Sequence, residues 1–409
     1  MTTLSMPKER LRFVLMEGIH PVATEVLQQN GYSSITTVER ALTGNELREA
    51  IADAHFIGIR SRTQLTEQVL TAAPRLVAVG CFCIGTNQVD LVAAERLGIP
   101  VFNAPFSNTR SVAELVLAEI VFLLRGIPQK NAAAHRGEWL KSASAAFEAR
   151  GKTLAIIGYG HIGSQLGVLA EGLGMRVIYY DIENKLPLGN ATPTPDLHSV
   201  LGQADVVSLH VPETPETQLM IGAKEIAAMR DGAHLINASR GTVVDIEALA
   251  EALQSGKLAG AAVDVFPTEP KSNADEFVNP LRRFDNVILT PHIGGSTQEA
   301  QRNIAEDVAS KLVRYSDNGS TNGAVNFPQV SLPQHLDKRR ILHMHHNVPG
   351  VLEQINHIFS EEGVNIAAQY LQTSANVGYV VMEVELDDAM PLVERLRGVP
   401  GTIRARLLH

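Results

Sequence analysis

A glycine motif directly after an apolar run places the strongest constraint on how this chain can fold. Gly158-Tyr159-Gly160-His161-Ile162-Gly163 follows the β-rich run 154–157 and opens a segment rich in Leu, Ala and Val. In such a motif the first glycine permits a tight turn, the second lets a pyrophosphate approach the backbone, and the third lets the helix pack closely on the strand. The motif therefore predicts a strand, a turn and a helix that bind a dinucleotide.

An acidic residue at the end of the next β-rich run supports this prediction. Asp181 follows the run 176–180 and lies eighteen residues after Gly163. A carboxylate there accepts hydrogen bonds from the ribose hydroxyls of NAD and repels the 2′-phosphate of NADP. A glycine turn without a ligand would not need the strand, the spacing and the acid together, so we expect NAD as the cofactor.

Polar residues also follow other β-rich runs of the same region. Runs at 154–157, 176–180, 205–211, 234–237, 260–265 and 286–290 are separated by helical or turn segments, which predicts a doubly wound parallel sheet. Ligands of such sheets bind at the carboxyl ends of the strands, so residues there should converge on one site. The candidates at these ends are His210, Val211, Pro212, Ala238, Ser239, Arg240, Asp264, His292, Ile293, Gly294 and Gly295.

Length and composition exclude several classes of protein. A chain of 409 residues predicts two or three domains, and 45% hydrophobic with 19% charged residues is ordinary for globular proteins. No apolar run approaches the ~18 residues of a membrane span, and the N-terminus lacks a signal-peptide core. We therefore expect a cytoplasmic location and no membrane partner. The net charge of −9 works against nucleic-acid binding.

Cys81 and Cys83 are expected to be small buried residues rather than metal ligands or a redox pair.

The order of the predicted elements divides the chain. The first hundred residues alternate short strands and helices, and capping-box patterns at Ser111 and Ser296 predict helices reaching about Gly126 and Tyr315. The Asn-, Gly-, Ser- and Pro-rich segment 317–338 is predicted to be a linker, and residues 340–409 follow a ferredoxin-like β-α-β-β-α-β order. We expect one domain at 1–107 completed by 296–336, an NAD-binding Rossmann-like domain at 108–295, and a third domain at 337–409.

Three segments resemble the signature regions of a known family. Residues 154–181, 205–227 and 235–249 resemble those of the NAD-dependent D-isomer 2-hydroxyacid dehydrogenases, and the resemblance covers nearly all of the chain from Arg10 onward. Within the family, residues 81–90 and 106–112 and the C-terminal domain are most similar to the bacterial branch that oxidises 3-phospho-D-glycerate to 3-phosphooxypyruvate. The resemblance thus implies the first step of L-serine biosynthesis, under feedback inhibition by L-serine.

The resemblance assigns Arg240, Glu269 and His292 as the catalytic set. Oxidising a 2-hydroxy acid requires a base for the hydroxyl proton, and imidazole suits that role near neutral pH. Glu269 would orient His292 and stabilise its protonated form, an assignment that rests on the resemblance alone. Arg240 would hold the substrate carboxylate and the oxygen at the reacting carbon.

An anionic substrate of an acidic chain needs local positive charge. Arg60, Ser61 and Arg62 follow the β-rich run 56–59, Asn108 lies beside a helix N-terminus, and Lys141 follows Trp139. We expect these residues to meet a carboxylate and a phosphate, although simple solvation is an equal alternative for Lys141.

The last domain carries the turn His343-Met344-His345-His346-Asn347-Val348-Pro349-Gly350, which resembles the ligand turn of ACT domains. The resemblance places L-serine contacts on His345, Asn347 and Asn365, across a dimer interface, and implies a homotetramer. A metal site is the alternative for three clustered histidines. We expect no metal, because His343 and His345 alternate on a strand and no further ligand completes a site.

Two other functions remain open. The chain could act on another 2-hydroxy or 2-keto acid such as 2-hydroxyglutarate, or serve as an NAD-sensing scaffold without activity. The presence of Arg240, Glu269 and His292 together favours an enzyme.

Overall fold

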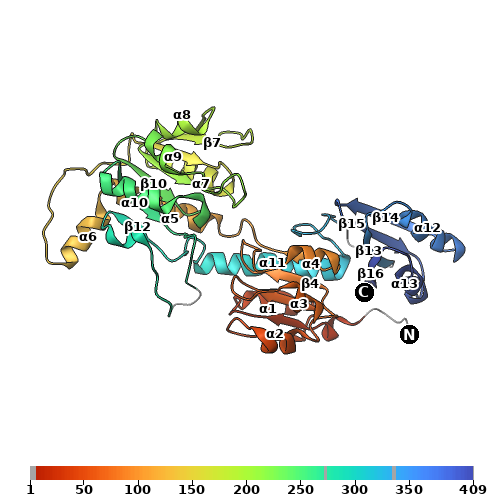
Figure 1. Ribbon diagram of the computed structural model, residues 1–409. Helices are drawn as coiled ribbons and strands as arrows, with labels where there is room; N and C mark the ends of the chain where they lie inside the picture. The colour runs from red at the N-terminus through yellow and green to blue at the C-terminus, as the bar shows by residue number, and fades with distance from the viewer. Residues whose placement is uncertain (1–5, 271–273, 334–337, 409) are drawn as a thin grey trace. The chain divides into compact units, whose positions relative to one another are not determined.

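The strands form three sheets in a computed structural model that describes residues 6–270, 274–333 and 338–408 (Figure 1). The chain divides into two compact units, Met1–Ser107 with Gln301–His409, and Asn108–Ala300. Two of the sheets are parallel and the C-terminal sheet is antiparallel, so the predicted α/β class is confirmed. Within the described residues, no helix has both the length and the apolar character needed to cross a membrane.

The first unit begins with a parallel sheet of order β2-β1-β3-β4-β5. Its strands are mostly short buried apolar runs, as expected for a sheet covered on both faces. The strands are β1 (Phe13–Leu15), β2 (Ile35–Thr37), β3 (Phe56–Ile59), β4 (Ala78–Cys81) and β5 (Val101–Phe102). A 3-10 turn and four helices accompany them: η1 (Lys8–Arg10), α1 (Val22–Gln29), α2 (Gly44–Ile51), α3 (Glu67–Thr71) and α4 (Leu91–Arg96). β2, α2 and α3 were not predicted from the sequence.

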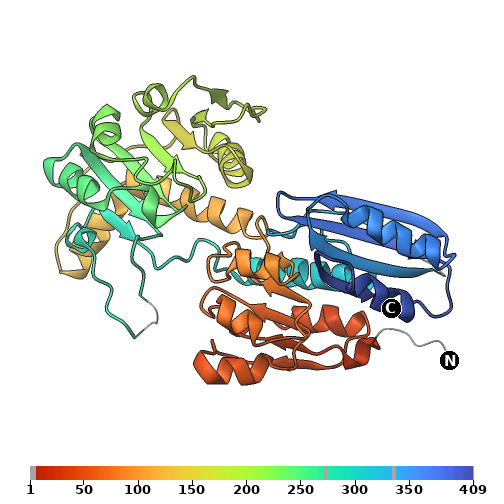
Figure 2. The ribbon, with the colours of Figure 1, turned by 45° about the vertical axis from the view of Figure 1, so that its right-hand side comes forward.

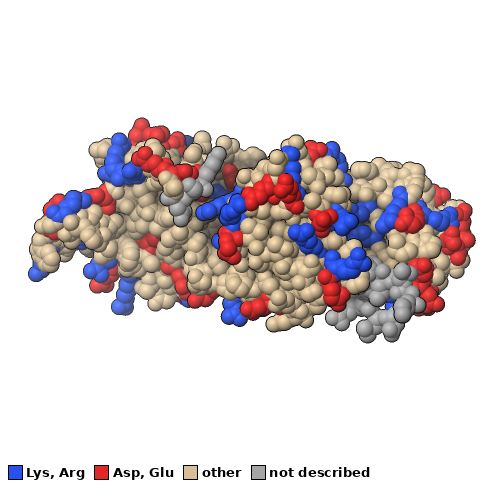
Figure 3. All heavy atoms as spheres, turned by 90° about the horizontal axis from the view of Figure 1, so that it is seen from below, with Lys and Arg blue, Asp and Glu red and all other residues tan. Residues whose placement is uncertain are grey.

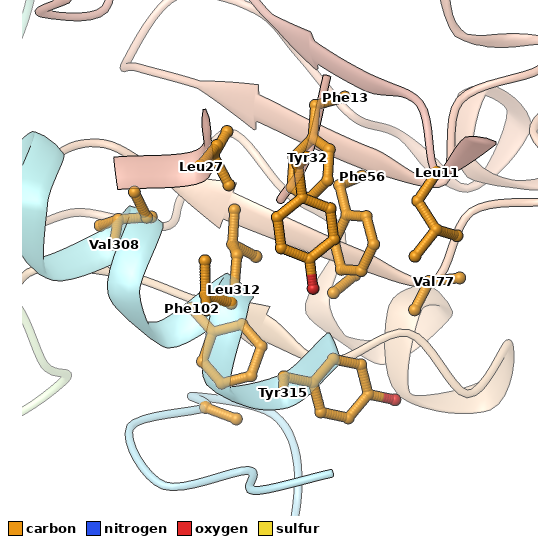
Figure 4. Close-up of a cluster of buried hydrophobic side chains, with 14 of the residues drawn as sticks. Leu11, Phe13, Leu27, Tyr32, Phe56, Val77, Phe102, Val308, Leu312 and Tyr315 are labelled. Atoms are coloured by element: carbon orange, nitrogen blue, oxygen red, sulfur yellow. The ribbon is translucent and has the colours of Figure 1, made fainter. Parts of the chain in front are cut away.

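A long helix from later in the chain completes the core of this sheet. Val308, Leu312 and Tyr315 of α11 (Gln298–Asn318) pack beside the stacked rings of Phe13 and Phe56, whose centroids lie 4.4 Å apart (Figure 4). The predicted cap at Ser296 is wrong by one residue, because the backbone N–H of Ala300 donates to Thr297 Oγ1 at 3.1 Å. The helix also runs three residues past its predicted end.

The segment predicted to be a linker is packed where the structure describes it. Phe327 and Leu332 are buried in the same cluster as Leu342 and Tyr379 of the following domain, and the Tyr379 hydroxyl donates to the Gly319 carbonyl at 2.6 Å. Apolar residues between the Asn, Gly and Pro positions explain the difference. Residues 334–337 of the predicted linker lie outside the described residues.

The C-terminal domain (residues 338–408) has every element that its sequence predicts. They are β13 (Arg339–His346), α12 (Val351–Glu361), β14 (Ile366–Thr373), β15 (Val377–Val384), α13 (Met390–Arg397) and β16 (Thr402–Leu407). The antiparallel order is β14-β15-β13-β16. Arg340 is fully buried beside Glu383, and its Nη1 also donates to the carbonyls of Asn318 at 2.7 Å and Pro333 at 3.0 Å. These bonds fix the domain to the end of α11.

The second unit is a parallel sheet of order β12-β11-β10-β9-β6-β7-β8 (Figure 2). The strand order reverses between β6 and β9, the position where open α/β sheets bind ligands. The strands are β6 (Thr153–Ile157), β7 (Arg176–Tyr180), β8 (Thr192–Pro193), β9 (Val206–Leu209), β10 (Ala233–Asn237), β11 (Leu258–Val263) and β12 (Val287–Leu289). The helices are α5 (Thr109–Leu124), α6 (Ile127–His135), α7 (His161–Gly172), α8 (Leu197–Leu201), α9 (Ala223–Ala228) and α10 (Ile246–Ser255), with 3-10 turns η2 (Gly241–Val243) and η3 (Pro280–Arg283).

The start of α5 differs from the prediction. The helix begins at Thr109 after Asn108, so Ser111 lies inside it rather than at its N-cap. The Ser111 hydroxyl instead makes a hydrogen bond with Thr297 Oγ1, at 2.7 Å. A tertiary contact that the sequence cannot show thus uses the side chain that the capping pattern singled out.

Candidate active site

The glycine loop of the second unit leaves no room for side chains at two of its three positions. Gly158 has φ +91°, and a Cβ on it would lie 2.4 Å from the His210 carbonyl oxygen. A Cβ on Gly163 would lie 2.2 Å from the Gly158 oxygen, whereas one on Gly160 would meet nothing within 4 Å. The backbone at Gly160 is therefore open to an incoming pyrophosphate, and α7 begins directly after it with His161 and Ile162.

Asp181 lies beside this loop, where β7 ends. Its Oδ2 accepts a hydrogen bond from the Tyr159 backbone N–H at 2.8 Å, and its Oδ1 accepts one from the Glu183 N–H at 2.9 Å. The carboxylate is thus fixed next to the glycine loop, as binding of a ribose next to the pyrophosphate requires.

The residues at the end of β9 pack against the glycine loop. His210 Nε2 pairs with Ser208 Oγ at 2.8 Å, and burial lowers the pKa of His210 to about 4, so this imidazole is neutral at pH 7. Val211 lies beside Gly158, and the Pro212 carbonyl accepts a hydrogen bond from Thr217 Oγ1 at 2.7 Å. This segment therefore borders the glycine loop.

A buried asparagine shapes the turn after β10. Asn237 Oδ1 accepts from the Ser239 N–H at 3.1 Å and the Ser239 hydroxyl at 2.8 Å, and its Nδ2 donates to the Arg240 carbonyl at 3.0 Å. Arg240 Nη1 donates to the Ser239 carbonyl at 2.7 Å. Ala238 lies between these two anchored positions. Asn237 was predicted only as the last residue of the β-rich run 234–237. An amide side chain at the end of a strand was the available signal that it would hold the turn.

Glu269 and His292 form a hydrogen-bonded pair. His292 Nδ1 lies 3.0 Å from Glu269 Oε2 and 3.1 Å from Oε1, and the Phe266 N–H also donates to Oε1 at 3.2 Å. The bond to Glu269 raises the pKa of His292 above its ordinary value, and burial opposes this. Burial alone would raise the pKa of Glu269, but the bond and the charge of His292 bring it below its ordinary value.

Arg240 lies close enough to act electrostatically on this pair. Its positive charge lowers the pKa of both Glu269 and His292. The structure therefore brings together the three residues that the family resemblance assigned as the catalytic set.

The turn that carries His292 is held in a constrained backbone conformation. His292 has φ +54°, a left-handed value that costs a residue with a side chain of the order of 1 kcal/mol. Asp264, only 2% exposed, accepts from the Ile293 N–H and the Gly294 N–H, each at 2.8 Å. A Cβ on Gly295 would lie 2.3 Å from Asn108 Nδ2, so the Asn108 side chain packs closely against this glycine. Asp264 thus fixes the position of the His292 ring through the backbone that follows it.

A second buried carboxyl group lies near Asp264. Glu119 of α5 is 3% exposed, and neither of its carboxyl oxygens has a hydrogen-bond partner within the described residues. Burial and the negative charge of Asp264 raise the pKa of Glu119 to about 8. Glu119 was not predicted as a site residue; the available signal was a carboxyl group inside the apolar stretch 113–124.

The predicted anion-binding residues are divided between the two units. In the first unit, the backbone N–H groups of Arg60, Arg62 and Thr63 donate to the Glu17 carboxylate at 3.2, 3.0 and 2.8 Å, and Ser61 is exposed between them. Glu17 itself was not predicted. In the second unit, Asn108 is buried against Gly295, and Lys141 is exposed two residues after the exposed ring of Trp139.

The predicted effector residues lie at the two ends of the C-terminal sheet: His345 and Asn347 at the end where His345 pairs with Gly378, and Asn365 at the end where Ile366 pairs with Val384. His345 is 3% exposed and packs against Gly378, where a Cβ would lie 2.2 Å from its Nε2. Asn347 is exposed and its Nδ2 donates to the Ser374 carbonyl at 2.9 Å, and Asn365 is exposed just before β14. Across residues 6–270, 274–333 and 338–408, no three His, Cys, Asp or Glu side chains group in a way that would hold a metal ion.

Family models match two parts of the chain. Residues 117–294 match the model of the D-isomer specific 2-hydroxyacid dehydrogenase NAD binding domain, and residues 341–404 match that of the AHAS small subunit-like ACT domain. The first match contains the glycine loop, Asp181 and the Arg240, Glu269 and His292 set. It makes the second unit an NAD-binding domain.

Two relatives that match the chain over almost its full length carry the same name. The chain is 64% identical over 411 residues to D-3-phosphoglycerate dehydrogenase of Escherichia coli strain K12, with 100% of both chains covered. It is 62% identical to the Haemophilus influenzae protein of the same name, with 99% of both covered.

Solved structures with lower identity have a similar fold. D-lactate dehydrogenase from Aquifex aeolicus, complexed with NAD and lactic acid, is 28% identical with a TM-score of 0.64, covering 74% of this chain and 95% of that one. The NAD complex of a D-isomer specific 2-hydroxyacid dehydrogenase from Lactobacillus delbrueckii ssp. bulgaricus is 27% identical with a TM-score of 0.68, covering 77% and 100%.

Proposed function

This chain belongs to the D-isomer specific 2-hydroxyacid dehydrogenase family, and we propose that it oxidises 3-phospho-D-glycerate to 3-phosphooxypyruvate with NAD. The observation that carries the proposal is the Glu269–His292 pair beside Arg240, in an NAD-binding domain. The full-length identity to proteins named D-3-phosphoglycerate dehydrogenase supports the choice of substrate. The reaction would be the first step of L-serine biosynthesis.

The second unit provides a site that fits NAD. The open backbone at Gly160 and the start of α7 would hold the pyrophosphate, and Asp181 would hold the adenosine ribose. The ends of β9, β10 and β12 would border the rest of the dinucleotide. NAD, when bound, supplies the acceptor for the hydride of the substrate.

His292 would take the proton of the substrate hydroxyl. Because Glu269 occupies Nδ1, Nε2 is the ring nitrogen left to accept that proton. Glu269 stabilises the imidazolium that results, and Arg240 would bind the substrate carboxylate through its guanidinium. Arg60, Ser61, Arg62, Asn108 and Lys141 would recognise the remaining anionic groups of the substrate.

The proposal is tested by measuring NAD reduction by the full chain with 3-phospho-D-glycerate, D-lactate, D-glycerate and D-2-hydroxyglutarate. We expect the highest kcat/KM for 3-phospho-D-glycerate, because only this substrate offers a phosphate to the basic residues. A tenfold preference for another acid would assign the chain a different substrate. Turnover of none of them would favour an NAD-sensing scaffold.

The carboxylate of Asp181 should also set the choice between the two nicotinamide cofactors. We expect kcat/KM with NAD to exceed kcat/KM with NADP by roughly tens-fold or more, because the carboxylate repels the 2′-phosphate. Asp181→Ala should make this ratio smaller. Glu183→Ala is the matched control, since it removes a carboxylate two residues away. Equal use of both cofactors by the unaltered chain would contradict the assignment.

We further propose that L-serine inhibits the enzyme through the C-terminal domain. The ACT model match and the exposed positions of Asn347 and Asn365 support a ligand site on this domain. His345 and Asn347 lie at one end of the sheet and Asn365 at the other, so the ligand would meet His345 and Asn347 of one domain and Asn365 of a second. Two such domains would share the ligand in a homotetramer, and inhibition would follow from a change in how the domains are arranged.

Asn347→Ala tests this regulatory proposal better than removal of the domain. Leu342 and Tyr379 share a core with Phe327 and α11, so truncation would expose apolar surface in the first unit. We expect Asn347→Ala to raise the half-inhibitory L-serine concentration at least tenfold while nearly preserving uninhibited turnover. Asn356→Ala, an exposed asparagine on α12, should change neither. Undiminished inhibition of Asn347→Ala would place the effector site elsewhere.

A further inference from the structure

A groove of about 360 Å³ lies within the first unit, between the segment that follows α3 and the last strand, β16. Pro74, Arg75 and Val77 line one side. Arg397, at the end of α13, and Arg404 and Arg406, on β16, line the other. None of these residues belongs to the proposed catalytic or serine sites, so the four arginines have no assigned role.

Two of these arginines have no acidic partner. Arg404 and Arg406 alternate along β16 and therefore share one face of the strand. Arg404 Nη1 donates to the Leu76 carbonyl at 2.5 Å, and the Arg406 guanidinium lies 5.7 Å from the centre of the Tyr315 ring. Within the described part of the chain, neither guanidinium pairs with a carboxylate. The groups that contact these two guanidiniums, the Leu76 carbonyl and the Tyr315 side chain, are neutral.

The positive charges in the groove are close enough to repel one another. Burial and the neighbouring charge of Arg406 lower the pKa of Arg404, and Arg75 and Arg406 add to burial in lowering the pKa of His55. The nearby acids are already paired, Asp53 with Arg75 at 3.6 Å and Glu394 with Arg397. On the face seen in Figure 3, acidic and basic side chains are interspersed over much of the surface, and several basic ones gather right of the centre.

We propose that this groove binds a small oxyanion with two or more negative charges, typified by a phosphoryl group. Guanidinium groups bind such oxyanions through paired, charge-assisted hydrogen bonds, and the volume suits a small ligand. An anion here would relieve the repulsion between Arg404 and Arg406. Because the two sides of the groove come from the first sheet and the C-terminal domain, it would also strengthen the attachment between them.

The chemistry fits both free phosphate and the phosphoryl group of a small metabolite. The binding is independent of the proposed dehydrogenase activity, because the groove contains no residue of the second unit. Glycerol 3-phosphate is a suitable probe for the second source, since it has a phosphoryl group but lacks the carboxylate of a 2-hydroxy acid.

Titration calorimetry of the full chain with inorganic phosphate, at constant ionic strength kept with chloride, tests the proposal. We expect saturable binding that Arg406→Gln weakens at least tenfold, because one charge-assisted contact is lost. Arg395→Gln is the matched control. Arg395 lies on α13, pairs with Glu361 and Glu362 outside the groove, and should leave binding unchanged.

A second variant guards against a folding defect in the first. Arg397→Gln changes an exposed residue at the groove edge and should weaken phosphate binding severalfold without affecting unfolding. Tighter binding of glycerol 3-phosphate than of phosphate would identify a phosphorylated metabolite as the ligand, and equal binding would identify free phosphate. Unchanged phosphate binding by Arg406→Gln and Arg397→Gln, or no binding beyond that of chloride, would overturn the proposal.

Discussion

Two pairs of side chains that contain histidine show opposite behaviour in this molecule. In the second unit, His292 bonds to the Glu269 carboxylate, and its pKa is raised. In the C-terminal domain, His343 is fully buried beside His345 with their Nδ1 atoms 3.4 Å apart, and burial lowers the pKa of His343 to about 4. The same imidazole group is thus able to gain a proton near pH 7 in one place and remains neutral in the other.

The difference shows that the hydrogen-bond partner of a histidine and its exposure to solvent set the pKa of its imidazole. A carboxylate stabilises the imidazolium, whereas a second imidazole and an apolar surrounding do not. His343 Nε2 pairs with Thr402 Oγ1 at 2.9 Å, so its polar atoms are used inside the domain. His343 therefore belongs to the packing of the domain, while His292 has the features of an acid/base.

The largest expected effect tests the catalytic side of this comparison. We expect His292→Asn to lower kcat about 10²-fold or more while NADH binding is retained, because the proton acceptor is removed. His357→Asn is the matched control, since His357 also bonds to a glutamate, Glu361, at 3.0 Å but lies exposed on α12. Steady-state kinetics and NADH fluorescence measure both quantities. Near-normal turnover of His292→Asn would remove His292 from the mechanism.

A smaller effect should appear in the pH profile of a Glu269 variant. Oxidation needs neutral His292, so its rate should rise as pH passes upward through the His292 pKa, which Glu269 raises. Glu269→Gln should lower that pKa, move the midpoint of kcat/KM to lower pH, and reduce the maximal rate about tenfold. Glu361→Gln should leave the profile unchanged. A midpoint that does not move would separate Glu269 from the titration of His292.

The smallest expected effect concerns stability and the buried pair. The folded pKa of His343, about 4, lies below the unfolded value of about 6.5, so the unfolded chain binds more protons between these values. The contribution of neutral His343 to the free energy of unfolding is therefore complete above pH 6.5 and falls as the pH decreases toward 4. At pH 5 this loss is about 1–2 kcal/mol. His343→Leu should flatten this dependence in calorimetric melting at pH 5 and pH 7.5. An equally steep loss in the variant would place the acid sensitivity elsewhere.

Local signals in the sequence were sufficient for much of the fold and for expecting Arg240, Asp264 and His292 shortly after the ends of strands. The bounds of β7 and β3 were predicted to the residue, because polar or turn residues mark both ends of these apolar runs. The glycine loop and Asp181 were found because their spacing is imposed by ligand geometry. Glu269, in contrast, has no local pattern and was identified only through the family resemblance.

Features that depend on tertiary contacts were missed. The short strands β2 and β8 are largely exposed at sheet edges and lack an apolar run. Ser111 has a capping pattern but bonds to Thr297, and Glu17 anchors a loop more than forty residues away. No pattern within a few residues encodes such partners.

The position of α11 in the core of the first sheet affects the order in which the chain folds during synthesis. The strands of that sheet are synthesised by residue 102, but Val308, Leu312 and Tyr315, which complete its core, follow only after the whole of Asn108–Ala300. At about 5–20 residues per second on the ribosome, this delay is about 10–40 seconds. We therefore expect the continuous second unit to fold first during translation, while the nascent N-terminal sheet stays incomplete and is the segment most in need of chaperone protection.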